Sequence, residues 1–164
     1  MNNLIRTVLA DQKGLHSPIH KWLESKEVRV CPESEKVPVQ VRDIFPPKNF
    51  IFPDVIGIRS NLDVFVVETE TDPEKIFEVM GKCMLWKTVA TYVYIAYPKE
   101  ECEKLKVLER FGIGLLGVSG DHVDEIIPLP TDGSNILKVV ELHPLDYQRQ
   151  ADLYRQAKRL IEAS

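Results

Sequence analysis

The sequence FIFPDVIGIRSNLDVFVVETE, residues 50–70, decides the fold of this chain. It contains two runs rich in β-branched and aromatic residues, 51–58 and 63–70, separated by the segment 59–62. Such a pattern is typical of a β-hairpin. Pro53 lies near the start of the first run, where a strand tolerates the loss of an amide hydrogen-bond donor. We therefore expect two antiparallel strands joined by a short turn.

Three acidic residues gather at the open end of this hairpin. Alternation along the second strand puts Glu68 and Glu70 on one face, together with the valines that precede them. With residues 60–62 as the loop, Asp54 lies directly across from Glu68, with Cβ atoms about 5 Å apart. A shift of one residue in the register would move Asp54 to the opposite face. Carboxylates this close repel one another unless a hard cation lies between them, so we predict a site for Mg²⁺ or Mn²⁺ formed by Asp54, Glu68 and Glu70.

The rest of the chain predicts an α/β domain. The expected elements outside the hairpin are, in chain order, helices over 2–12 and 17–26, strands over 28–31 and 37–41, a helix over 73–87, a strand over 91–97, a helix over 99–111, strands over 113–118 and 123–129, and a helix over 144–163. The second hairpin strand, the helix over 73–87 and the strand over 91–97 form a βαβ unit, whose strands are parallel and whose crossover is right-handed. We find no repeat and no linker, so we predict one domain over 1–164, with a mixed sheet flanked by helices, a core at about 15–130 and a C-terminal helix at about 144–163.

Composition sets limits on the class of protein. The chain has 164 residues, 44% hydrophobic and 28% charged, which is ordinary for a globular domain. Charges at Arg6, Asp11 and Lys13 argue against a signal peptide or a membrane span at the N-terminus. The formal net charge of −4 argues against a protein that binds nucleic acid over its whole surface, but not against an acidic metal site beside a local basic patch.

The cysteines, histidines and aromatic residues predict structural roles. The 3 cysteines are widely spaced, which indicates reduced thiols in a cytoplasmic protein. His16 and His20 have the spacing of one helical turn, but Pro18 is expected to open a new helix between them. Trp86 and the tyrosines of the βαβ unit are expected in the core rather than stacked on bases.

The motif PDVIG, followed after a turn by FVVETE, resembles the metal site of the PD-(D/E)XK nuclease superfamily, the restriction endonuclease-like proteins. In that family an Asp after Pro and an acid–x–Lys at the end of the next strand form the site. The order of elements from about Leu15 to Val118 supports the resemblance more than the short motif does. It implies that Asp54 and Glu68 are the first and second metal ligands.

One position departs from the family pattern. Glu70 stands where the family usually has a lysine that positions or activates the attacking water, although a few restriction enzymes are similar in having glutamate there. In other branches the lysine comes from the following helix, and Lys82 matches that place better than Lys87. The first helix of the family often adds an acid, for which Glu24 and Glu33 are the candidates.

The resemblance implies a magnesium-dependent DNA endonuclease that hydrolyses phosphodiester bonds. Asp54 and Glu68 would hold Mg²⁺ or Mn²⁺, Glu70 would bind the ion or accept a proton from water, and Lys82 would neutralise charge on the phosphate. A homodimer is compatible with cutting both strands. Two alternatives stay open: a nuclease-fold protein without catalysis that binds nucleic acid or a protein partner, and an α/β protein unrelated to nucleases. The absent lysine and the acidic net charge favour the first alternative.

Overall fold

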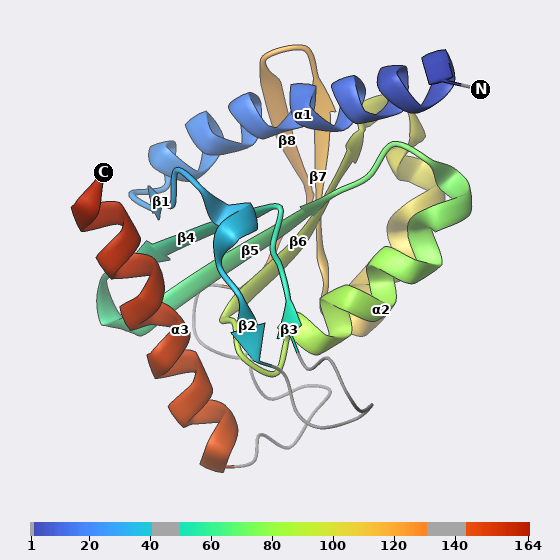
Figure 1. The fold of residues 1–164 in the computed structure, drawn as a ribbon. Coiled ribbons are helices and arrows are strands. Elements are labelled where there is room, and N and C mark those ends of the chain that lie inside the picture. The colour runs from blue at the N-terminus through green and yellow to red at the C-terminus, as the bar shows by residue number, and fades with distance from the viewer. Residues whose placement is uncertain (1, 41–49, 131–143) are drawn as a thin grey trace.

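The computed structural model describes residues 2–40, 50–130 and 144–164 (Figure 1). A mixed sheet with the order β1-β4-β5-β6-β7-β8 has helices against both faces, so the predicted α/β class is confirmed. β5, β6 and β7 run parallel, and β1, β4 and β8 pair antiparallel with their neighbours. The strands of this sheet are β1 (Arg29–Val30), β4 (Val55–Arg59), β5 (Asp63–Thr69), β6 (Tyr92–Pro98), β7 (Gly114–Ser119) and β8 (His122–Ile127).

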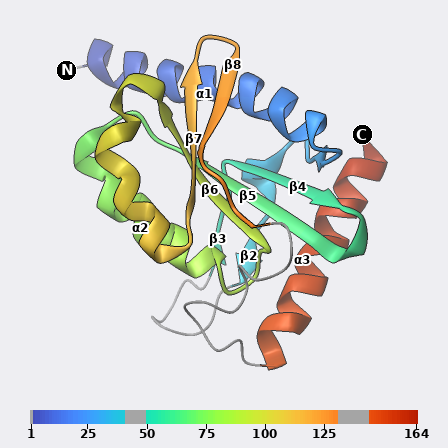
Figure 2. The same cartoon turned by 180° about the vertical axis from the view of Figure 1, so that it is seen from behind.

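The helices and a small second sheet complete a single domain (Figures 1 and 2). The α-helices are α1 (Asn2–Ser25), α2 (Ile76–Trp86) and α3 (Pro144–Ala163). The 3₁₀ segments are η1 (Ser34–Lys36), η2 (Ser60–Leu62), η3 (Pro73–Lys75) and η4 (Lys99–Phe111). The second sheet pairs β2 (Val39–Gln40) with β3 (Phe50–Ile51).

Alternation along β5 decides which side chains meet which helices. Val64 and Val66 are fully buried in the core shared with α2, η4 and α3, whereas Phe65 and Val67 are buried in the core that α1 covers. Burying one such side chain contributes about 1.5–3 kcal/mol, so both faces hold the strand in one register. Two residues further on, the same alternation points Glu68 toward α2.

The hairpin has the register that the sequence predicts. Arg59 pairs with Asp63 and Val55 pairs with Val67, so Asp54 and Glu68 are the next opposed positions. The first arm is shorter than expected, because the chain leaves the ladder around Pro53, which has no amide hydrogen to donate.

The prediction of two N-terminal helices is wrong, because α1 runs continuously through Gly14 and Pro18. Glycine and proline cost a helix interior about 1 and 3 kcal/mol. Against that cost, Ile19 and Leu23 are fully buried on the sheet, and most of the stability of a helix in a protein comes from such packing. His16 and His20 therefore do lie one turn apart on one helix.

The predicted helix over 99–111 is a 3₁₀ helix. Its buried side chains Cys102, Leu105 and Leu108 recur every third residue, which is the period that gives a 3₁₀ helix one apolar stripe. Gly112 ends it with a φ of 61°, the left-handed conformation that glycine adopts without strain. Among the described residues, no helix is long and apolar enough to cross a membrane.

Candidate active site

The predicted catalytic residues surround one hollow at the carboxyl end of β5. We call it the carboxylate pocket; its lining residues are Asp54, Glu68, Thr69, Glu70, Lys75, Glu78, Val79 and Lys82, and its cavity volume is about 240 Å³. Carboxyl ends of parallel strands are common positions for sites in α/β sheets. The lining holds more carboxylates than ammonium groups, so the pocket attracts cations.

Glu68 is the most deeply buried of these acids, with 2% of its surface exposed. Lys82 Nζ donates to Glu68 Oε2 at 2.6 Å, and Trp86 Nε1 donates to Glu68 Oε1 at 2.7 Å. Burial raises the pKa of Glu68 to about 7, the nearby Asp54 carboxylate adds to the rise, and Lys82 and Trp86 oppose it. Glu68 is therefore a carboxyl group that exchanges a proton near neutral pH, a property that suits acid–base chemistry.

Asp54 is held by Thr69 on the neighbouring strand. Asp54 Oδ2 accepts from the Thr69 amide at 2.8 Å and from the Thr69 hydroxyl at 2.9 Å. His16 Nε2 lies 3.3 Å from the same hydroxyl oxygen. Because the hydroxyl proton points to Asp54, His16 is the donor in the remaining contact, with the proton on Nε2. The chain His16–Thr69–Asp54 thus fixes one oxygen of the first predicted ligand.

Glu70 turns back toward its own loop. Its Oε1 accepts from the amides of Thr71 at 2.8 Å and Asp72 at 2.8 Å, and only 4% of the residue is exposed. Glu70 lines the carboxylate pocket, and its Oε1 stabilises the turn that leads into η3. Its role as a metal ligand or proton acceptor stays a prediction.

Within the part of the chain that the structure describes, no three His, Cys, Asp or Glu side chains are grouped to hold a metal ion. The side chains of the carboxylate pocket fit a Mg²⁺ site that has fewer protein ligands. The donors are carboxylate oxygens, and Mg²⁺ is often held by one or two carboxylates with substrate phosphates completing its shell. Asp54 and Glu68 supply these two carboxylates once Lys82 moves away from Glu68. The three-carboxylate site stays a prediction.

Lys82 comes from the middle of α2 and lines the carboxylate pocket. Lys87 does not reach the carboxylate pocket, because its Nζ donates to the carbonyls of Phe111 and Gly112 at 3.0 and 2.8 Å. Glu24 and Glu33 are not among the residues that line the carboxylate pocket, and Glu33 pairs with the adjacent Lys36 at 2.6 Å.

The residues that orient the acids were not predicted from the sequence. Trp86 was expected in the core and is fully buried, but its indole N–H also binds Glu68. Its spacing of four from Lys82 is the signal that could have revealed a shared helix face. His16 and Thr69 carry no such signal, because their contact joins segments distant in the sequence.

Comparison with known proteins shows that the fold of this chain is similar to that of a solved structure. No protein-family model matches the chain, and no curated protein sequence matches it. A solved structure of a protein of unknown function from Silicibacter pomeroyi, SPO1766, superposes with a TM-score of 0.59 at 16% sequence identity. The match covers 93% of this chain and 86% of the other. The chain therefore shares the overall arrangement of SPO1766.

Proposed function

We propose that this protein is a metal-dependent nuclease of the restriction endonuclease-like fold, which hydrolyses phosphodiester bonds in DNA. The observation that carries the proposal is the gathering of Asp54, Glu68, Glu70 and Lys82 around the carboxylate pocket. The β4–β5 hairpin, the β5–α2–β6 crossover and the lysine on α2 support it further.

The residues of the carboxylate pocket have distinct roles in this proposal. Asp54 and Glu68 hold Mg²⁺ or Mn²⁺, which supplies Lewis-acid stabilisation of the phosphate and a more acidic water. Thr69 orients Asp54, so that Oδ1 is the oxygen left to face the ion. Lys82 leaves Glu68 to neutralise charge on the phosphate, and Lys75 adds a second cation at the rim. Glu70 accepts a proton from water in place of the family lysine.

Cleavage of supercoiled plasmid in Mg²⁺ or Mn²⁺ tests this function. The isosteric variants Asp54→Asn and Glu68→Gln are expected to lower the rate at least about 100-fold, the scale of removing one electrostatic group from a hydrolytic site. Glu103→Gln, at an exposed acid on η4, is the matched control and keeps the rate. Nicking that persists equally in all three variants would trace to a contaminant, and the enzyme proposal would then fail.

A second function, nucleic-acid binding without catalysis, is favoured by one specific contact. Lys82 Nζ lies 2.6 Å from Glu68 Oε2 and neutralises the buried carboxylate. The lysine thus takes the place that a metal ion would have beside Glu68 in the nuclease. Isothermal titration with Mn²⁺ separates the two functions. Saturable binding that Asp54→Asn abolishes supports the nuclease, whereas duplex DNA binding without Mn²⁺ binding supports the second function.

A further inference from the structure

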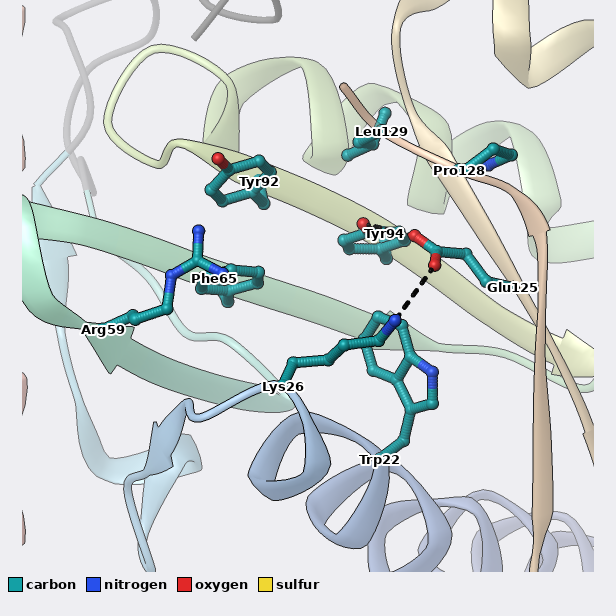
Figure 3. Close-up of a pocket in the computed structure, with 9 residues that line it drawn as sticks. All are labelled: Trp22, Lys26, Arg59, Phe65, Tyr92, Tyr94, Glu125, Pro128 and Leu129. Carbon is teal, nitrogen blue, oxygen red and sulfur yellow. Dashed lines mark hydrogen bonds and ion pairs between the residues drawn. The ribbon is translucent and has the colours of Figure 1, made fainter. Parts of the chain in front are cut away.

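A second pocket lies on the α1 side of the sheet, away from the carboxylate pocket (Figure 3). We call it the aromatic pocket; it has a cavity volume of about 240 Å³, and the side chains that matter here are Trp22, Lys26, Arg59, Tyr92, Tyr94 and Glu125. They come from the end of α1, from the turn that follows it, and from β4, β6 and β8, so the fold rather than one segment builds the pocket.

Aromatic rings dominate its inner surface. Phe65 and Tyr92 stack across β5 and β6 with ring centroids 4.4 Å apart and planes 20° apart. Trp22 meets Tyr94 edge to face, with centroids 5.4 Å apart and planes at 73°. Trp22 is half-buried, and Lys26 Nζ lies over its ring, 5.5 Å from the centroid. Aromatic side chains of this kind stack on planar bases.

The carboxylate of Glu125 is the acceptor of the aromatic pocket. Tyr94 OH donates to Glu125 Oε1 at 2.9 Å, while Lys26 Nζ lies 3.7 Å from Oε2, farther than a hydrogen bond (Figure 3). Burial and the Glu125 charge raise the pKa of Tyr94, so its hydroxyl stays a donor at neutral pH. The loose pair with Lys26 leaves Oε2 able to accept from a ligand N–H group.

Arg59 supplies a fixed cation. Its Nη2 and Nε donate to Asp63 Oδ2 at 2.8 and 3.2 Å, and its guanidinium carbon lies 5.2 and 5.6 Å from the ring centroids of Phe65 and Tyr92. In Figure 3, Arg59 and Glu125 lie on either side of the rings of Phe65 and Tyr94. The aromatic pocket thus has an acceptor on one side, a cation on the other and rings between them.

We propose that the aromatic pocket binds a guanine mononucleotide. The base displaces the Lys26 ammonium from the ring of Trp22 and stacks there. Its N1–H and N2–H donate to Glu125, while the phosphate faces Arg59 and the displaced Lys26. Guanine fits better than adenine, because adenine presents an acceptor at N1 where the carboxylate needs a donor.

Isothermal titration of the whole protein in EDTA, with GMP, AMP and inorganic phosphate as separate ligands, tests the proposal. GMP is expected to bind and to quench Trp22 fluorescence, and to bind at least about tenfold more tightly than AMP. Glu125→Gln is expected to weaken GMP at least about tenfold, and Lys26→Ala to weaken it less. The matched control is Lys21→Ala on α1, whose lysine is 3.9 Å from Asp121 and outside the aromatic pocket.

Several outcomes would overturn the proposal. They are equal affinity for GMP and AMP, unchanged affinity in Glu125→Gln, and binding of a guanine-containing oligonucleotide in the absence of GMP binding. Asp54→Asn must bind GMP as the wild type does, since a loss there would move the ligand to the carboxylate pocket. None of these results depends on nuclease activity, so the two proposals stand or fall separately.

Discussion

At the scale of the residue, Glu68 combines burial with donors that keep it in place. Its carboxyl is placed between a lysine and an indole, yet burial outweighs both in setting its pKa. The folded state therefore binds the Glu68 proton at a higher pH than the unfolded chain, whose pKa is near 4.5. Stability from this group is fully present below that value and declines as pH rises toward 7.

Glu68→Gln is expected to remove this pH dependence, because glutamine does not titrate. Relative to the wild type, the variant gains stability as pH rises from 4.5 to 7, by about 3 kcal/mol at most. Urea denaturation at several pH values from 4.5 to 8 measures the difference between the two proteins. A difference that does not change with pH would contradict the raised pKa of Glu68.

Thr69 joins His16 to Asp54, so its hydroxyl is expected to matter more than its size. Thr69→Val removes the partly buried hydrogen bond to Asp54 and the contact with His16, at a cost of about 1–3 kcal/mol in the free energy of unfolding. Thr69→Ser keeps the hydroxyl and is the matched control, expected to lose less than half as much. Chemical denaturation compares the three proteins, and equal losses in both variants would exclude the hydroxyl contact.

At the scale of the element, the strands could be predicted more fully than the helices. Alternation in residues 63–70 predicted the face of Glu68, and the loop at 60–62 predicted the register that opposes Asp54 to it. The rotation of α2 about its axis was not predictable, because it depends on packing against η4 and the sheet, and this rotation brings Lys82 and Trp86 to Glu68. The continuity of α1 was not predicted for a similar reason. Gly14 and Pro18 indicate a break between two helices, whereas packing further along the chain favours one continuous helix.

Gly14→Ala tests the continuity of α1. A Cβ at Gly14 would meet nothing within 4 Å, and alanine stabilises a helix interior by about 1 kcal/mol relative to glycine. Gly81→Ala on α2, where a Cβ also meets nothing, is the reference for an undisputed helix and should give a similar gain. Thermal unfolding measures both. Destabilisation by Gly14→Ala alone would instead indicate a helix end at that glycine.

At the scale of the whole molecule, the two proposed sites share a sheet but use its opposite faces. The carboxylate pocket lies beyond the carboxyl end of β5 on the α2 side, and the aromatic pocket on the α1 side. The sequence predicted the first because its residues are close along the chain. It gave no sign of the second, because Trp22, Arg59, Tyr94 and Glu125 meet only through the topology of the sheet.

The cysteines allow whole-molecule stability to be measured directly. Cys31, Cys83 and Cys102 are all free and buried, and burial raises the pKa of each thiol, that of Cys102 to about 11. We expect these thiols to react with a disulfide reagent only when the domain opens. Reaction rates should rise together with increasing urea, in parallel with the unfolding transition. Fast reaction of one thiol in the native protein would reveal local opening of its segment.

The alternation of β5 has a consequence for how the gene can change. Substitutions along this strand alter one side of the sheet at a time, because neighbouring residues serve separate cores. The loss or gain of a single codon between Val64 and Val67 would instead exchange the two sides from that point on. Glu68 would then turn toward α1, and Thr69 (after a loss) or Val67 (after a gain) would face Lys82. Changes in length are therefore expected at η2 and other connections, while β5 keeps a constant length in every functional descendant.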